Sequence, residues 1–123
     1  FPPIELVDTV PIDVSVQAEA FVRPPGRTIY LVTSSPVFRT AQRSRAECGD
    51  YFAVKKLASI LAHEEWHVKN GSDERGAYLA QLTTLSFMGV APDNALYTSV
   101  VRSMQAVLKK KAEKPAMILA AKQ

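Results

Sequence analysis

The only two histidines of the chain lie four residues apart, in the segment His63-Glu64-Glu65-Trp66-His67. On an α-helix, residues i and i+4 project from the same face one turn apart, so both imidazoles can contact one metal ion. Glu64 would then lie beside the open position of that ion, where it can accept a proton from a water molecule. The H-E-x-x-H spacing therefore predicts a zinc site with a general base.

The segment before the histidines is typical of a half-buried helix. Residues 51–62 contain no glycine or proline, and apolar side chains recur at intervals of three and four, at Val54, Leu57, Ala58, Leu61 and Ala62. We predict one helix from this segment through His67. The alternative is a surface helix with two solvated histidines. Trp66 is expected to line the cleft or to pack the helix against a sheet.

A zinc ion with an open position for water needs a third protein ligand. Since no other histidine remains, a carboxylate is the best candidate. The residue six positions after His67 is Asp73, which excludes the metzincin pattern, because that pattern has a histidine there. Glu74 is the favoured ligand, with Asp73 or a more distant group as alternatives, because acidic residues also favour the first turn of any helix.

A short connection should bring this carboxylate close to the histidines. Asn70-Gly71-Ser72 predicts the end of the first helix, with Ser72 as the N-cap of a second helix that runs from Asp73 to about Met88. The first turn of the second helix would then lie beside His67.

These residues resemble a known family. The stretch from Ala18 to Ser35, an apolar helix and His63-Glu64-Glu65-Trp66-His67 are similar to the core of gluzincin zinc peptidases, which include minigluzincins and the HtpX and CAAX-prenyl endopeptidases. Glu74-Arg75-Gly76-Ala77 matches the first four positions of their Glu-x-x-Ala-Asp motif, and Tyr78 replaces its aspartate. The resemblance covers roughly residues 18 to 82. It implies that His63, His67 and Glu74 bind zinc and that Glu64 is the general base.

Tyr78 is a second candidate catalytic residue. Because Glu74 and Tyr78 are spaced i and i+4, they share one helix face, and the phenol could donate a hydrogen bond to a metal ligand or to a developing oxyanion. The alternative is a tyrosine half-buried between helices. Arg75 is another group that could help to polarise a substrate carbonyl. Gln81, one turn further along, is expected at the helix surface.

Strands are expected before the zinc helix. Pro24-Pro25-Gly26-Arg27 suits a type II turn between an alternating apolar segment, Val14 to Ala20, and the apolar run Ile29 to Val32. If a strand edge binds the substrate backbone, as in β-augmentation, Thr28–Ser35 is the candidate. An ordinary core strand is the alternative.

A third helix is predicted over residues 94–111 and is expected to end before Pro115. Its last turn, Lys109-Lys110-Lys111, carries much of the net charge of +3. Lysines at a helix C-terminus interact favourably with the helix dipole, and no aromatic residues are interleaved with them. We therefore expect a solvated helix end rather than a nucleic-acid-binding surface.

Length and composition predict a single domain over residues 1–123, since the chain has 123 residues of which 47% are hydrophobic. Strands before helices predict an α+β, zincin-like domain: an N-terminal β-hairpin or sheet packed on the zinc helix, then two further helices.

No apolar run approaches the roughly 20 residues of a membrane span. The start Phe1-Pro2-Pro3 is compatible with a trimmed, exported protein, but the sequence assigns no compartment. The single cysteine, Cys48, is expected to be an ordinary thiol at a helix start.

Together these patterns predict a monomeric zinc metallopeptidase that acts on a peptide or protein substrate. The alternative function is a catalytically silent zinc-binding or interaction module, in which the metal stabilises a small core.

Overall fold

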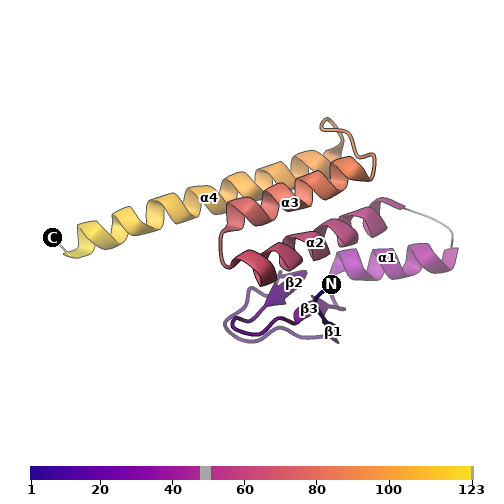
Figure 1. Cartoon of the computed structure of the whole chain (residues 1–123), viewed down its shortest axis with the longest axis horizontal. Coiled ribbons are helices and arrows are strands. Elements are labelled where there is room, and N and C mark those ends of the chain that lie inside the picture. Colours follow the sequence, from indigo (N-terminus) through magenta and orange to yellow (C-terminus); the bar gives the residue numbers. More distant parts are fainter. Residues whose placement is uncertain (48–50, 123) are drawn as a thin grey trace.

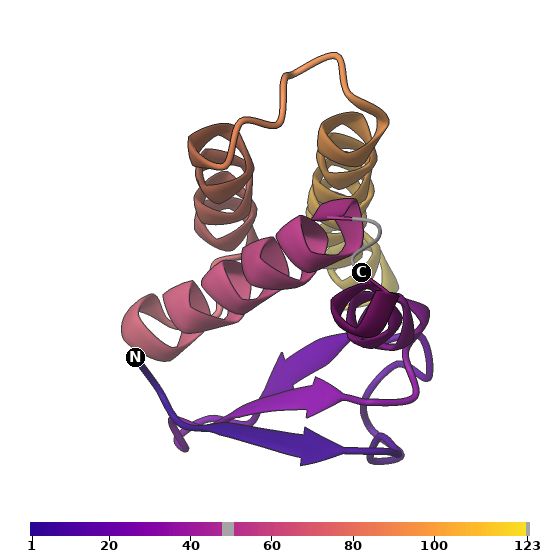
Figure 2. The same cartoon turned by 90° about the vertical axis from the view of Figure 1, so that its right-hand side faces the viewer.

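The computed structural model describes residues 1–47 and 51–122, so Cys48 lies outside the described residues. Within them, three strands precede four helices: β1 (Ile4–Val7), β2 (Ala20–Val22), β3 (Ile29–Val32), α1 (Pro36–Glu47), α2 (Tyr51–Asn70), α3 (Glu74–Phe87) and α4 (Ala95–Lys122). Figure 2 shows three layers: the sheet, then α1 and α2, then α3 and α4. The predicted α+β domain, with two helices after the histidine helix, is confirmed.

The sheet is small and β3 is its central strand. β3 pairs in parallel with β1 and antiparallel with β2. Ile29 and Leu31 of β3 are buried, whereas Tyr30 stacks on Phe21 of β2, with 5.0 Å between ring centroids. The suggestion that Thr28–Ser35 provides a free strand edge is therefore wrong, because β3 has a strand on each side. The edge strands of the sheet are β1 and β2, and β2 is the edge strand that packs against α2.

The turn between β2 and β3 differs from the predicted type II turn. The Gly26 N–H donates to the Arg23 carbonyl at 2.9 Å, so Pro24 and Pro25 are the central residues, and the bond between them is cis. Gly26 is not one of the glycines with positive φ, which are Gly71 and Gly89 in the described part of the chain.

The sequence analysis did not predict the first helix, α1, and included Thr33 to Ser35 in the candidate strand Thr28–Ser35. The Ser35 hydroxyl accepts a hydrogen bond from the Phe38 N–H at 3.3 Å, and Pro36 is the first helical residue. Serine at the N-cap followed by proline at the first position is a helix-start signal, and it could have identified α1.

Helix α2 is buried on more than one side. The predicted helix is confirmed, but its most buried residues are Ala53, Ser59, Ile60 and His63, and the predicted core residue Val54 is 39% exposed. The reason is that α1, β2 and β3 contact one side of α2 while α3 contacts another. Polar residues such as Ser59 and His63 are thereby placed between layers.

Helices α3 and α4 pack on each other through an apolar cluster that includes Leu82, Leu85 and Val100. Helix α4 was predicted to end before Pro115, but it continues to Lys122. Its C-terminal half extends past the other elements (Figure 1). A proline removes one backbone hydrogen bond but does not always end a helix. In the described part of the chain, no helix is both long and apolar enough to cross a membrane.

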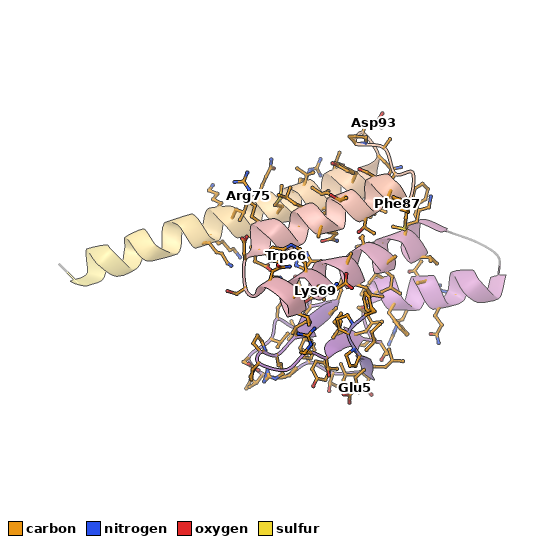
Figure 3. The ribbon with its side chains drawn as sticks, viewed as in Figure 1. Glu5, Trp66, Lys69, Arg75, Phe87 and Asp93 are labelled. Carbon is orange, nitrogen blue, oxygen red and sulfur yellow. The ribbon has the colours of Figure 1, made fainter. Side chains whose placement is uncertain are left out.

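Trp66 of α2 lies directly against Gly76 of α3. A Cβ atom built on Gly76 would lie 2.1 Å from Cζ2 of the Trp66 indole, so only glycine fits at this position of α3. Trp66 lies between α2 and α3, whereas Arg75 points away from α2 (Figure 3). One of the two roles expected for Trp66 was to pack α2 against the sheet. The indole instead packs against α3, so this expectation is wrong.

We predict that Gly76→Ala lowers the free energy of unfolding by about 2 kcal/mol, because the added methyl group overlaps the indole. Helix propensity alone would change stability in the opposite direction, by about 1 kcal/mol. Urea denaturation measures the difference.

Arg75→Ala, at the exposed neighbouring position, is the matched control and should change stability little. Combining Gly76→Ala with Trp66→Phe should recover part of the loss, because the smaller ring vacates the overlapping space. Wild-type stability of Gly76→Ala alone would contradict the close packing.

Candidate metal centre

Three side chains converge where α2 ends and α3 begins. His63 and His67 project from one face of α2, and Glu74 is the first residue of α3. Glu74 Oε1 lies 3.5 Å from His63 Nε2 and makes a close contact with His67 Nε2. The potential ligand atoms of the three residues lie within 4.8 Å of one another, and the group could hold a metal ion.

Gly71 makes this convergence possible. Its φ of +91° ends α2 with a sharp reversal, and its N–H donates to the His67 carbonyl at 2.9 Å. Only three residues separate α2 from α3, so the first turn of α3 returns beside the last turn of α2.

Asp73 has a different role from Glu74. Its carboxylate accepts a hydrogen bond from the Arg75 N–H at 3.1 Å, so Asp73 is the N-cap of α3. The predicted cap, Ser72, does not fill that position. The Asp73 side chain satisfies the backbone of α3 and is not part of the group of possible metal ligands.

Hydrogen bonds orient both imidazole rings. His63 Nδ1 lies 2.9 Å from Oε1 of Gln81, and His67 Nδ1 lies 2.7 Å from the carbonyl oxygen of Gly71. Because both partner oxygens can only accept, each Nδ1 must carry a hydrogen and donate it. In the neutral rings this leaves the lone pair on each Nε2, the atom that faces Glu74, and metal-binding histidines commonly have this arrangement.

Gln81 is a site residue that the sequence analysis placed wrongly at the helix surface. Its side chain is only 6% exposed, and its Nε2 donates to the hydroxyl of Ser59 at 3.4 Å. The Ser59 hydroxyl donates in turn to the Lys56 carbonyl at 2.7 Å. Spacing could have found Gln81, because it lies seven residues after Glu74 and so on the same face of α3, two turns along.

Tyr78 lies beside His63, as its spacing from Glu74 predicts. The two rings meet edge to face, with 4.6 Å between centroids. Burial raises the pKa of the Tyr78 phenol, and the negative charges of Glu74, Glu64 and Glu19 raise it further. The phenol therefore stays protonated at neutral pH and is able to donate a hydrogen bond. Arg75 is exposed and lines neither of the pockets at the site.

The two glutamates of the site have opposite electrostatic environments. Hydrogen bonds to His63 and His67 hold the pKa of Glu74 well below its usual range, so this carboxylate is ionised. Burial raises the pKa of Glu64, although the two histidines act in the opposite direction. Two neighbouring carboxylates with different proton affinities are suited to different roles, one as an anionic ligand and one as a proton acceptor.

His67 also has a shifted proton affinity. Burial alone would lower its pKa, but the hydrogen bonds to Glu74 and to the Gly71 carbonyl, with the charges of Glu74 and Glu64, raise it overall. In the absence of a metal, these interactions favour a proton on Nε2 of His67, between this ring and Glu74. A cation bound between them would replace that proton.

Comparisons of the chain with protein-family models, curated proteins and solved structures found no match. The resemblance to gluzincins remains a prediction.

We predict that Gln81→Leu lowers zinc affinity by about tenfold, because His63 loses the acceptor that orients its ring. Competition with a chromophoric chelator measures the affinity. Gln81→Glu keeps an oxygen acceptor for His63 and should therefore retain more of the zinc affinity than Gln81→Leu.

The matched control is Gln105→Leu, at an exposed position of α4. A Gln81→Leu protein with native circular dichroism and wild-type zinc affinity would show that the bond to His63 has no positioning role.

Proposed function

We propose that the protein is a zinc-dependent metallopeptidase. The observation that carries the proposal is the convergence of His63 Nε2, His67 Nε2 and Glu74 Oε1, with a fourth side chain, Glu64, lining the same two pockets as His63. Three protein ligands and a nearby carboxylate form the donor set of a catalytic rather than a structural zinc site.

The residues fit a zinc ion in chemical type as well as in position. Imidazole nitrogen and carboxylate oxygen are both common zinc ligands, and in the neutral rings the Nδ1 hydrogen bonds leave the Nε2 lone pairs available to a metal. When bound, zinc lowers the pKa of a water molecule towards about 7 and polarises a substrate carbonyl.

Glu64 is the proposed general base. It would accept the proton of the attacking water and pass it to the amine nitrogen of the leaving group. The raised pKa of Glu64 supports this role, because a base is most effective when its pKa is near the working pH. Tyr78, protonated and beside His63, would donate a hydrogen bond to the developing oxyanion.

The edge of β2 is the proposed binding surface for the substrate backbone. Ala20 lines both of the pockets that Glu64 lines, and Phe21 and Val22 line one of them. An extended peptide could pair with this edge as an added strand, which would present its carbonyl to the site.

We predict that the wild-type protein binds one zinc ion per chain, and that His63→Ala, His67→Ala and Glu74→Ala lose it. Asp73→Ala should retain zinc, at a stability cost of about 1 kcal/mol from the lost helix cap. Mass spectrometry of the metal content and thermal denaturation separate the two effects. Absence of zinc from the wild-type protein after reconstitution would contradict the proposed function.

We predict that Glu64→Gln keeps zinc but lowers kcat by roughly 100-fold or more on a peptide that the wild-type protein cleaves, because the amide cannot accept the proton. Tyr78→Phe should also keep zinc and should lower kcat with little change in KM.

The appropriate assay combines a peptide-library digest with metal analysis of the same samples. A zinc-loaded wild-type protein that behaves like Glu64→Gln in every assay would support the alternative of a silent zinc-binding module.

A further inference from the structure

The cleft beside the histidines has two pockets, which meet at Ala20, His63 and Glu64. One extends towards α4 and is lined by polar groups, including the hydroxyl-bearing residues Ser99 and Ser103. The other has a volume of about 420 Å³ and lies between β2, the α2–α3 connection and α4. We call the second one the Lys111 pocket; it is lined by Ala20, Phe21, Val22, Pro24, His63, Glu64, His67, Gly71, Ser72, Glu74 and Lys111.

Each pocket has one lysine, but the two lysines differ in their partners. Lys56, in the first pocket, forms an ion pair with Glu19 at 3.4 Å, so its charge is compensated. Lys111 donates to the carbonyl oxygen of Ser72 at 3.2 Å, and among the residues whose side chains are described, 1–43 and 52–111, no carboxylate pairs with its Nζ.

The hydrogen bond to Ser72 joins the Lys111 ammonium to another residue that lines the pocket. An ammonium group has three N–H donors, and the Ser72 carbonyl uses one of them. The pocket is also lined by Ala20, Phe21 and Val22 of β2, which supply no charge, and by the carboxylates of Glu64 and Glu74 at the candidate metal centre. Lys111 is exposed to solvent, and a charge-assisted hydrogen bond from its ammonium to a carboxylate is stronger than a hydrogen bond between neutral groups.

Assuming the peptidase function above, we propose that Lys111 is a specificity-determining residue that binds a carboxylate of the substrate. The carboxylate is either an Asp or Glu side chain or the C-terminal carboxylate of the peptide, since both present the same two oxygens. Substrates with an anionic group on the Lys111 side of the scissile bond would be favoured over neutral ones.

The test uses zinc-loaded protein and a set of fluorogenic peptides that differ only in charge. One series moves a single Asp along the peptide, with Asn at the same position as the neutral match. A second series compares a free C-terminal carboxylate with the amide. The wild-type protein should prefer an anionic peptide by about tenfold in kcat/KM, mainly through KM.

Lys111→Ala should remove this preference, and Lys111→Glu should reverse it in favour of a Lys-bearing peptide. Lys110→Ala, the adjacent exposed lysine of α4 that does not line the pocket, is the matched control and should keep the preference. A response to internal Asp identifies a side-chain subsite, and a response to the free C-terminus identifies capture of the chain end. Preference retained in Lys111→Ala, or absent from the wild-type protein, would overturn the proposal.

A binding measurement separates this proposal from the peptidase function. In the Glu64→Gln background, calorimetry with the same peptides should give about tenfold tighter binding of the anionic member, and adding Lys111→Ala should remove the difference. Selective binding without cleavage by any variant would reject the peptidase and support the Lys111 subsite. Equal binding of both peptides would reject the subsite even if cleavage is observed.

Discussion

The contact between Trp66 and Gly76 brings α2 and α3 close together, and the site depends on this packing. Because Gly76 has no Cβ, the indole lies directly against the backbone of α3. The first residue of α3, Glu74, then lies beside the Nε2 atoms of His63 and His67. An anionic carboxylate next to two partly buried imidazoles would be unfavourable without compensation, and a shared proton or a metal ion provides it.

A second constraint acts on the outer side of the imidazole rings. The backbone of Gly71 orients His67, and the side chain of Gln81 orients His63. The Gln81 amide oxygen accepts the Nδ1 proton of His63. Because the amide is neutral, this bond orients the ring without placing a second carboxylate in the core. The layered fold makes this possible, because α2 is covered by the strands and α1 on one side and by α3 on another. A buried polar side chain on α3 can therefore reach a histidine of α2.

Local patterns in the sequence predicted the elements that carry the site. The helix around His63 and His67, the break at Gly71, the position of Glu74 at the start of the next helix and its shared face with Tyr78 all follow from helical periodicity and turn chemistry over a few residues. The α+β class follows from the order of strands and helices. These features depend on interactions between residues close in the chain, which a single sequence records.

Only the tertiary structure decided which side chains meet across elements. Asp73 and Glu74 both have a carboxylate side chain. Asp73 caps the backbone of α3, whereas the carboxylate of Glu74 contacts the histidines. Gln81 is polar and was expected at the surface, yet packing between α2 and α3 buries it. The β1–β3 pairing left β2, rather than β3, as the edge beside α2. Spacing along a chain specifies the direction of a side chain on its own element, whereas its partner depends on how the elements pack.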